Sequence, residues 1–497
     1  NDNIKKYMHN AKFIQVLLLR QGIDLQGAVG DTMLLAYVDD PAFNGDLLSN
    51  TIYKYSKKQV PLQRPDLQVL NLRALHNEIF EQINEGLQKL YFEVEMPLSS
   101  CLAHMEFSGI KVEGNVLKDL SRDLAEGILK NEEIIFKLAQ QEFNISSPKQ
   151  LGEVLFEDLG LRKIKKTKTG YSTGAEVLEE LFFDHDIIKP IIDYRLLSKL
   201  KSTYVDALQK LIHPDSGRVH TIFKQAQTTT GRLSSIEPNL QNIPTRMEEG
   251  RKIRAAFVAG KPEMVLLSAD YSQIDLRTLA HISQDQVLIE TFKKGLDIHK
   301  RTAAEIFKVP ADQVNSDFRR RAKAVNFGII YGISDFKLAK DTGVSRFEAK
   351  KYIDDYLNTY PGVKKYMQDI VDFAMRHGYV ETLLKRRRYL PDINSRNKNI
   401  QAFAKRMALN TPIQGTSADI IKLAMLDIDK KLQSEKLHTK MLLQIHDELV
   451  LEVTREEITV AAAILKEAME NAYSLAVPLK VNFKTGTDWG KMQELNI

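Results

Sequence analysis

Residues 264–270 have the sequence MVLLSAD, an apolar run that leads directly into a carboxylate. A short run of this composition predicts a buried strand that delivers Asp270 at its end. Residues 441–453, MLLQIHDELVLEV, are largely apolar on both sides of His446 and Asp447. This pattern predicts two strands joined by a tight hairpin turn. One mixed sheet, split by a long insertion, would bring the two strand ends together.

Two carboxylates that meet on one sheet could hold two magnesium ions about 4 Å apart. Such a pair of ions clamps the attacking and leaving oxygens of a phosphoryl transfer. Glu448 follows Asp447 directly and could support the site. An Asp at a strand end is more often a turn or capping residue, and the spacing of Asp270 and Asp447 alone leaves both interpretations open.

Residues 318–332, FRRRAKAVNFGIIYG, place Arg319, Lys323, Phe327 and Tyr331 four positions apart. On a helix these side chains follow one slowly drifting row, with two cations before two aromatic rings. A nucleoside triphosphate needs charge for its phosphates and a flat apolar surface for its base and sugar. A solvated basic stretch followed by core aromatics would give the same pattern, so periodicity leaves that alternative open.

The rest of the chain alternates between helical and strand-rich regions. Residues 1–90 have the pattern of a small α/β piece, and residues from about 95 to 210 are helical. Residues 211–275 are strand-rich, residues 284–435 are helical, and the last 60 combine strands with a helix. The strand-rich segments therefore flank a helical insertion.

Composition excludes several classes of protein. The 497 residues are 43% hydrophobic and 27% charged, with a net charge of +5, which is typical of a globular protein and not of a disordered one. The single cysteine, Cys101, cannot form an internal disulfide or a Cys-based zinc site. Nothing approaches 18 consecutive apolar residues, so no membrane span is expected, and the polar start does not resemble a signal peptide.

Several short segments are rich in cations, hydroxyls and amides. Residues 228–235 (TTTGRLSS, with Arg232), 239–244 (NLQNIP) and 410–415 (NTPIQG) suit contacts with phosphates, sugars and minor-groove bases. They equally suit ordinary turns. Residues 385–388, KRRR, are more typical of a solvated loop than of a binding site.

Together these segments resemble motifs A, B and C of family A DNA polymerases. The three motifs correspond to DYSQIDLRTLAH (270–281), RRRAKAVNFGIIYG (319–332) and QIHDELV (444–450), in that order. TTTGRLSS, NLQNIP, NTPIQGTSADIIK (410–422) and DIHKRTA (297–303) also match. The resemblance covers nearly the whole chain and is closest to bacterial members of the family.

The resemblance implies an α+β fold of right-hand architecture, with an antiparallel palm sheet and helical fingers and thumb. It also implies an N-terminal α/β remnant of a 3′→5′ exonuclease-like domain. The expected boundaries are residues 1–95 for this partial, inactive domain, 96–210 for the thumb, 211–275 and 436–497 for the two parts of the palm, and 276–435 for the fingers.

Roles for individual residues follow from the same motif positions. Asp270, Asp447 and the Tyr271 backbone carbonyl would hold two Mg²⁺ ions, and Glu448 and Lys323 would complete the catalytic set. The expected nucleotide contacts are Arg319, Lys323, Phe327, Tyr331, His299, Gln273 and Asp275. The expected contacts with DNA are Arg232, Asn239, Asn242, Arg406, Asn410, Gln414 and His446.

The implied function is a template-directed DNA polymerase of DNA replication and repair. It would add deoxynucleotides to a primer 3′-hydroxyl by two-metal phosphoryl transfer, with primer–template DNA and deoxynucleoside triphosphates as partners. The family expectation is a cytoplasmic, nucleoid-associated bacterial monomer with no membrane attachment. Two alternatives are a non-catalytic nucleic-acid-binding protein on a polymerase scaffold and a polymerase that mainly copies RNA. The presence of both aspartates and of both cations of the basic helix disfavours the first.

Two departures concern the nucleotide pocket. Asp275 stands where the family usually has a glutamate that helps exclude a ribose 2′-hydroxyl, so we expect weaker rejection of ribonucleotides. Phe327 accompanies discrimination against dideoxynucleotides in this family, and we expect Phe327→Tyr to relax it.

A third departure concerns proofreading. Residues 9–14, HNAKFI, resemble the second exonuclease motif, but Ile14 stands where the family has an aspartate. The first 95 residues contain no Tyr-x-x-x-Asp. A two-metal nuclease needs its carboxylates, so no proofreading is expected.

Overall fold

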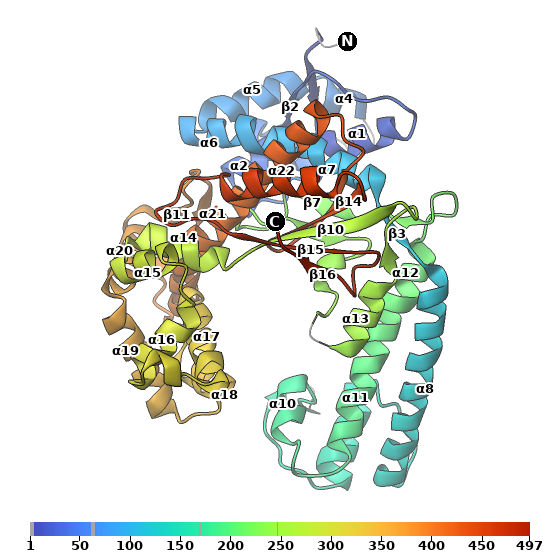
Figure 1. The fold of residues 1–497 in the computed structure, drawn as a ribbon, viewed down its shortest axis with the longest axis vertical. Helices are drawn as coiled ribbons and strands as arrows, with labels where there is room; N and C mark the ends of the chain where they lie inside the picture. Colours follow the sequence, from blue (N-terminus) through green and yellow to red (C-terminus); the bar gives the residue numbers. More distant parts are fainter. Residues whose placement is uncertain (1–3, 61–64, 168–169, 246) are drawn as a thin grey trace.

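A five-stranded sheet lies at the centre of the chain, whose computed structural model describes residues 4–60, 65–167, 170–245 and 247–497 (Figure 1). Its strand order is β13-β14-β10-β15-β16. The strands are β10 (Met264–Tyr271), β13 (Lys440–Ile445), β14 (Glu448–Thr454), β15 (Val481–Gly486) and β16 (Gln493–Leu495). Every pairing is antiparallel, so the mixed sheet expected from the strand pattern is wrong. The short β13–β14 and β15–β16 connections are too short for a parallel crossover.

The strand predicted at 264–270 is confirmed as β10, which is the middle strand of this sheet. Val265, Leu266, Leu267 and Ala269 are buried in the largest hydrophobic core of the described residues. Helix α22 (Ile458–Glu470) contacts β10, β14 and β15, and α7 (Met96–Ser108) contacts β13. A strand enclosed in this way holds the position of the residue at its end.

The N-terminal region, residues 4–95, lies on the side of the sheet that carries α7 and α22 (Figure 1). Its α1 packs on α7, and its last turn, η1, contacts α2, α7 and α21. The elements are β1 (Lys6–Met8), α1 (Ala11–Leu19), β2 (Ala28–Asp31), α2 (Thr32–Asp39), α3 (Leu48–Ser56), α4 (Pro65–Val69), α5 (Leu72–Gln82), α6 (Glu85–Leu90) and η1 (Tyr91–Glu95). These contacts tie the region to the central part of the molecule.

A first helical arm, residues 114–211, extends from one side of the sheet (Figure 1). Its long helices α8 (Gly114–Ala139) and α11 (Ile188–Lys199) pack together, and its tip has a hydrophobic core of its own. The remaining elements are α9 (Pro148–Glu153), η2 (Val154–Asp158), β4 (Lys166–Thr167), β5 (Gly170–Tyr171), α10 (Ala175–Glu180), η3 (Leu200–Val205) and α12 (Asp206–Leu211). The helical character expected here is confirmed.

A second helical arm, residues 274–377, extends from the other side (Figure 1). It consists of α14 (Ile274–Ser283), α15 (Gln286–Lys293), α16 (Ile298–Phe307), η5 (Ala311–Gln313), α17 (Ser316–Ile330), α18 (Asp335–Thr342), α19 (Arg346–Thr359) and α20 (Pro361–His377). The hairpin of β11 (Tyr379–Glu381) and β12 (Arg387–Tyr389), the turn η6 (Pro391–Asn394) and the long helix α21 (Lys398–Ser434) lead back to the sheet. Lys340 on α18 lies 3.8 Å from Glu180 on α10, so the tips of the two arms meet.

The segment expected to be strand-rich before β10 also contains a helix. Short strands β6 (Arg218–Val219), β7 (Ile222–Lys224), β8 (Ser234–Ile236) and β9 (Phe257–Val258) are present, with β3 (Ile110–Val112) pairing with β6 and β9 and with the turn η4 (Leu240–Asn242) after β8. Between them, α13 (Glu248–Ala255) was not expected. No helix of the described residues is long and apolar enough to cross a membrane.

Candidate active site and nucleotide cavity

Asp270 and Asp447 meet at one end of the central sheet. Asp270 on β10 is in register with Glu448 on β14 and with Asn482 on β15. Asp447 lies in the predicted turn between β13 and β14, and its carbonyl oxygen accepts a hydrogen bond of 3.1 Å from the Tyr271 amide. Backbone pairing therefore fixes both carboxylates, which confirms the predicted convergence.

Among the described residues, the cations that act on these two carboxylates, Lys484 on Asp270 and Arg232 on Asp447, do not outweigh burial and the neighbouring acids. Burial, and then the charges of Asp447 and Glu448, raise the pKa of Asp270 to about 7, although Lys484 opposes the shift. Burial, and then the charge of Asp275, raise the pKa of Asp447 to about 6. Like charges held close together favour a proton or a bound cation between them.

The donor set suits a magnesium ion. Magnesium prefers hard oxygen ligands, usually one or two carboxylates, with the remaining positions left to water and substrate phosphates. Asp270, Asp447 and the Tyr271 carbonyl are oxygen donors of this kind. Within the described part of the chain, no three His, Cys, Asp or Glu side chains form a group that could hold a metal.

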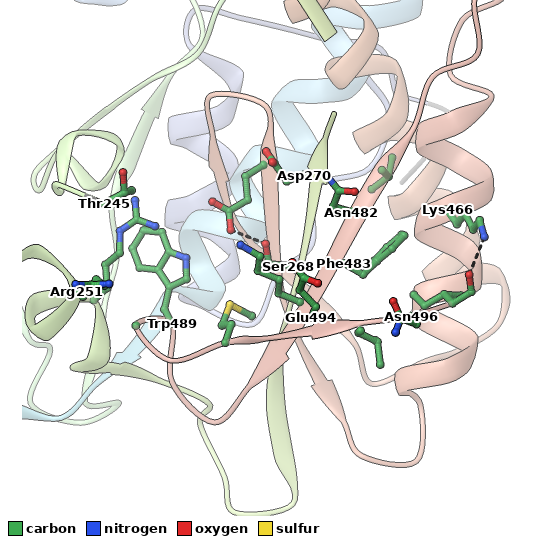
Figure 2. Close-up of a pocket in the computed structure, with 18 residues that line it drawn as sticks. Thr245, Arg251, Ser268, Asp270, Lys466, Asn482, Phe483, Trp489, Glu494 and Asn496 are labelled. Atoms are coloured by element: carbon green, nitrogen blue, oxygen red, sulfur yellow. Dashed lines mark hydrogen bonds between the residues drawn. The ribbon is translucent and has the colours of Figure 1, made fainter. Parts of the chain in front are cut away.

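Glu448 faces a polar cavity of 640 Å³ beside this strand end (Figure 2). Ser268 Oγ donates a hydrogen bond to Glu448 Oε1, which fixes the carboxylate (Figure 2). On the opposite wall, the Arg254 guanidinium lies 3.8 Å from the ring centroid of Trp489. Trp489 is 4% exposed. Glu448 thus has a hydrogen-bond partner of its own beside the two candidate metal-binding carboxylates.

A second cavity, of 330 Å³, gathers many of the predicted nucleotide and DNA contacts. Its walls come from α14, α17, α21 and the β13–β14 turn, and Arg232 Nη2 lies 3.3 Å from Asp275 Oδ2 on one side of it. The lining residues are Arg232, Ile274, Asp275, Phe327, Tyr331, Ser417, Ala418, Ile421, His446 and Asp447. The cavity therefore joins an aromatic wall to one of the two candidate metal-binding carboxylates.

Helix α17 presents the predicted basic and aromatic row. Arg319 and Lys323 are exposed, and Lys323 Nζ lies 5.9 Å from the ring centroid of Phe327. Arg319 is also paired with Asp297, at 2.8 Å. Tyr331 caps the helix, and Gly332 follows with a φ of +62°, a conformation that glycine adopts without strain. Two cations thus stand on the same helix as the aromatic wall of the cavity.

Two predicted nucleotide contacts are less accessible. His299 is 2% exposed, and Asn326 Nδ2 donates to its Nδ1 at 3.0 Å. Burial lowers the pKa of His299 to about 4, although Asp297 opposes the shift, so the ring is neutral. Gln273 is half-buried at the start of α14 with a φ of +56°. A phosphate contact from His299 would need the ring to become exposed.

Apart from Arg232, the predicted DNA contacts lie on three elements: the turn η4, the β13–β14 turn and helix α21. Asn239 and Asn242 are exposed around η4, and Gln241 between them donates to the Gln444 carbonyl oxygen at 3.1 Å. His446 is exposed, with a φ of +56°, in the turn that carries Asp447. The other three, Arg406, Asn410 and Gln414, follow one another at four-residue spacing on α21 and therefore share a helix face.

Two profiles of known protein families match this chain. The profile of DNA polymerase family A matches residues 114–491. The chain belongs to DNA polymerase family A. A second profile, described as the ribonuclease H-like domain of DNA polymerase I, matches residues 1–64.

Curated members of the family are similar along almost the whole chain. DNA polymerase I of Geobacillus stearothermophilus is 50% identical over 507 aligned residues, and that of Bacillus subtilis (strain 168) is 47% identical over 510. Each alignment covers 98% of this chain and 58% of the relative, so the chain spans little more than half the length of these proteins.

A solved structure shows the same fold. The POL domain of Pol1 from M. smegmatis, in complex with DNA primer-template and dNTP, superposes with a TM-score of 0.95 and 40% identity. The match covers 99% of this chain and 87% of that one. The right-hand α+β fold that the motifs imply is confirmed for this family A chain.

In the ribonuclease H-like region, both carboxylate oxygens of the buried Asp31 accept hydrogen bonds from backbone amides. Asp31 Oδ1 accepts from the amides of Asn10 at 3.0 Å and Met33 at 2.8 Å, and Oδ2 accepts from Ala11 at 2.6 Å. Asp31 therefore caps α2 and ties it to the start of α1. The neighbouring Ile14 supplies no oxygen ligand.

Sequence reasoning missed one buried charged group near the candidate active site. Arg386, within the KRRR segment expected to be a solvated loop, is 1% exposed, so that expectation is wrong for this residue. Its guanidinium contacts Glu95 and Asp419, and Lys422 joins the same group. The available signal was a pair of charged residues, Asp419 and Lys422, in an otherwise apolar stretch of α21.

Proposed function

We propose that this chain is a template-directed DNA polymerase that adds deoxynucleotides to the 3′-hydroxyl of a primer. The observation that carries the proposal is the meeting of Asp270 and Asp447 beside a cavity walled by Phe327 and Tyr331. Arg319 and Lys323 stand exposed on the helix that forms this wall. The related M. smegmatis domain was solved with primer-template DNA and dNTP, which supports the same substrates here.

The side chains divide the work of a phosphoryl transfer. Asp270, Asp447 and the Tyr271 carbonyl would hold two divalent cations such as Mg²⁺, which would supply positive charge to the reacting oxygens. Arg319 and Lys323 bind the triphosphate, and Lys323 is well placed to neutralise the pyrophosphate that leaves. Phe327 packs against the sugar, and Tyr331 limits the space for the base pair. Catalysis rests mainly on position and charge.

Substrate geometry would be sensed from the minor-groove side. Arg232 and His446 line the cavity, and Gln414 is next to Tyr331 on its α21 side. The minor-groove acceptors of A·T and G·C pairs lie in similar places for every correct pair. Contacts there suit an enzyme that copies any sequence but responds to mismatches.

The parts of the chain take the roles that the family gives them. Residues 96–210 act as the thumb, 276–435 as the fingers, and 211–275 with 436–497 as the palm. The chain works as a monomer on primer–template DNA in the bacterial cytoplasm, associated with the nucleoid. Residues 1–95 do not proofread, because position 14 is Ile and the oxygens of Asp31 already accept backbone amides.

Primer extension on a DNA template tests this proposal. Wild type and Asp447→Ala are compared with four deoxynucleotides and magnesium, and extension by wild type alone is the expected result. Extension by both proteins would mean a wrong carboxylate assignment. Extension by neither, with duplex binding intact, would favour the non-catalytic scaffold, and a preference for RNA templates would favour the RNA-copying alternative. Trimming of a mismatched 3′ end by wild type would refute the absence of proofreading.

A further inference from the structure

Four charged side chains form a buried cluster where three parts of the chain meet. Glu95 ends the N-terminal region, Arg386 lies in the β11–β12 turn, and Asp419 and Lys422 lie on α21. Each of the four side chains is at most 1% exposed. We call these four residues the buried ion cluster.

Every charge in the buried ion cluster has a partner. Arg386 Nη2 donates to Glu95 Oε1 and to Asp419 Oδ1, the latter at 2.7 Å. Lys422 Nζ lies 2.8 Å from Glu95 Oε1, and Thr382 Oγ1 donates to Asp419 Oδ2 at 2.7 Å. Two cations therefore balance two carboxylates, and the bonds fix the three segments relative to one another.

The buried ion cluster and the N-terminal region both contact residues 225–232, which we call the strap. Gln225 Nε2 donates to the Glu95 carbonyl oxygen at 2.7 Å and to the Glu95 carboxylate. Further along, Tyr37 OH donates to the Thr228 carbonyl oxygen at 2.7 Å. Gly231 has a φ of +84°, and any Cβ there would clash with the Arg386 guanidinium. The strap is thus held at three points.

The far end of the strap enters the nucleotide cavity. Thr228 Oγ1 donates to the Arg232 carbonyl oxygen at 2.6 Å, and the Arg232 side chain reaches Asp275 at 3.3 Å. Arg232 lines the cavity together with Asp447. A continuous set of bonds therefore leads from Tyr37 and Glu95, in the nuclease-like region, to a side chain beside a candidate catalytic carboxylate.

We propose that the N-terminal region positions Arg232 in the nucleotide cavity, with Tyr37, Glu95 and Arg386 as positioning residues. This inference rests on the proposed polymerase function, since its consequence is measured as nucleotide incorporation. A buried ion cluster is weak evidence for stability, because desolvation offsets its attraction, but its directional bonds specify one geometry. The region that has lost its nuclease residues keeps a role in polymerisation.

Hydrogen exchange tests the mechanical part without any need for activity. In the full-length chain, Tyr37→Phe removes only the bond to Thr228, and amide exchange in the strap should rise roughly three- to tenfold. The matched control is Tyr55→Phe. In the wild type the Tyr55 hydroxyl donates to Asp39 at 2.7 Å, so the control removes a hydrogen bond that lies wholly inside the N-terminal region. Unchanged exchange in Tyr37→Phe, or an equal rise in both variants, would overturn the proposal.

A double-mutant cycle tests whether the effect passes through Arg232. Single-turnover incorporation with excess enzyme should show that Tyr37→Phe lowers kcat/KM by roughly three- to tenfold. In an Arg232→Ala background the same change should have almost no effect, because coupled residues are not additive. The cycle can be repeated with Arg232→Lys in place of Arg232→Ala, because the lysine keeps the positive charge and should reduce the background activity less. An equal loss in both backgrounds would contradict positioning and indicate a general structural role.

A second perturbation enters from the cluster itself. The double variant Glu95→Gln/Lys422→Met removes one carboxylate and one cation, so Arg386 and Asp419 remain a balanced pair. It should also release the strap and lose kcat/KM only when Arg232 is present. If wild type itself incorporates no nucleotide, the polymerase function fails, while hydrogen exchange still decides whether the strap is held.

Discussion

Two pairs of carboxylates in this chain, Glu95 with Asp419 and Asp270 with Asp447, face opposite electrostatic surroundings. In the buried ion cluster, burial would raise the pKa of Glu95, but Lys422 and Arg386 outweigh it and hold the pKa at about 2. At the end of the central sheet, burial and neighbouring acids raise the pKa of Asp270 to about 7. Glu95 and Asp419 are completely buried, whereas Asp270 and Asp447 are half-buried beside cavities. Burial alone would nevertheless raise the pKa of Glu95 as it raises that of Asp270. The number of opposing cations decides whether a carboxylate pair is structural or free for a ligand.

Neutralising one carboxylate of the uncompensated pair should have the largest effect on activity. Asp270→Asn should lower the single-turnover incorporation rate about a thousandfold or more, since transition-state charge loses its electrostatic support. The same change removes like-charge repulsion, so urea unfolding should show equal or greater stability without metal. A variant that kept more than a tenth of the rate would place the chemistry elsewhere.

The same kind of change in the compensated pair should act mainly on stability. Glu95→Gln leaves Arg386 and Lys422 with a single carboxylate, and breaking a buried pair in this way costs about 3–5 kcal/mol. Glu93→Gln is the matched control, because Glu93 is exposed and lies 3.8 Å from Lys89. We expect the control to change the free energy of unfolding by less than about 0.5 kcal/mol. Equal urea midpoints for the two variants would show that the cluster does not act as a closed unit.

The stability that Asp270 and Asp447 contribute and the stability that Glu95 contributes should depend on pH with opposite signs. The folded state raises the pKa of Asp270 to about 7 and that of Asp447 to about 6. Their contribution to the free energy of unfolding is therefore fully present below about pH 4 and is lost as the pH rises towards 7. Glu95 has a depressed pKa, so its contribution is present above its ordinary value and lost as pH falls towards 2.

Urea unfolding in a chelator at pH 5 and pH 8 measures the first half of this comparison. From pH 5 to pH 8 the free energy of unfolding of the wild type should fall by about 3 kcal/mol more than that of the double variant Asp270→Asn/Asp447→Asn. Magnesium added in place of the chelator should reduce this difference. Parallel pH profiles for both proteins would show that the two aspartates do not interact strongly.

Asp275 lies between the compensated and the uncompensated carboxylates, because only one of its two oxygens faces a cation. Its substitution should have the smallest effect of those considered. One of its oxygens faces Arg232 at 3.3 Å, and the other is buried with no hydrogen-bond partner in the part of the chain that the structure describes. Asp275→Glu extends the carboxylate by one methylene into the cavity, so rejection of ribonucleotides should improve roughly three- to tenfold. The ratio of kcat/KM for ribo- and deoxynucleotides measures this, and equal or stronger rejection by the Asp form would refute it.

The strand pattern predicted the strand end and the hairpin turn that carry the first pair, and their meeting on one sheet, but not that the sheet is antiparallel. An apolar run ending in Asp270 and a turn at His446 and Asp447 are local features, and antiparallel pairing brings them together. Residue roles needed the family motifs, because a strand-end Asp looks the same whether it caps a turn or holds a metal.

The second pair could not be predicted in this way. Arg386 belongs to a run of four cations that is typical of solvent-exposed chain, and its partner Glu95 is 291 positions away. Local patterns show charge but not what lies opposite it after folding. The burial of His299 has the same origin, since Asn326 and the helix that carries it come from 27 positions further along the chain.

Trp489 is the only tryptophan among the 497 residues, and it forms one wall of the cavity that holds Asp270 and Glu448. Its ring is stacked with the Arg254 guanidinium and is shielded from water. Selective excitation of indole therefore reports from this one place in the chain. A ligand that enters this cavity beside β10 should therefore change the emission of the unlabelled protein, in real time and without an introduced dye.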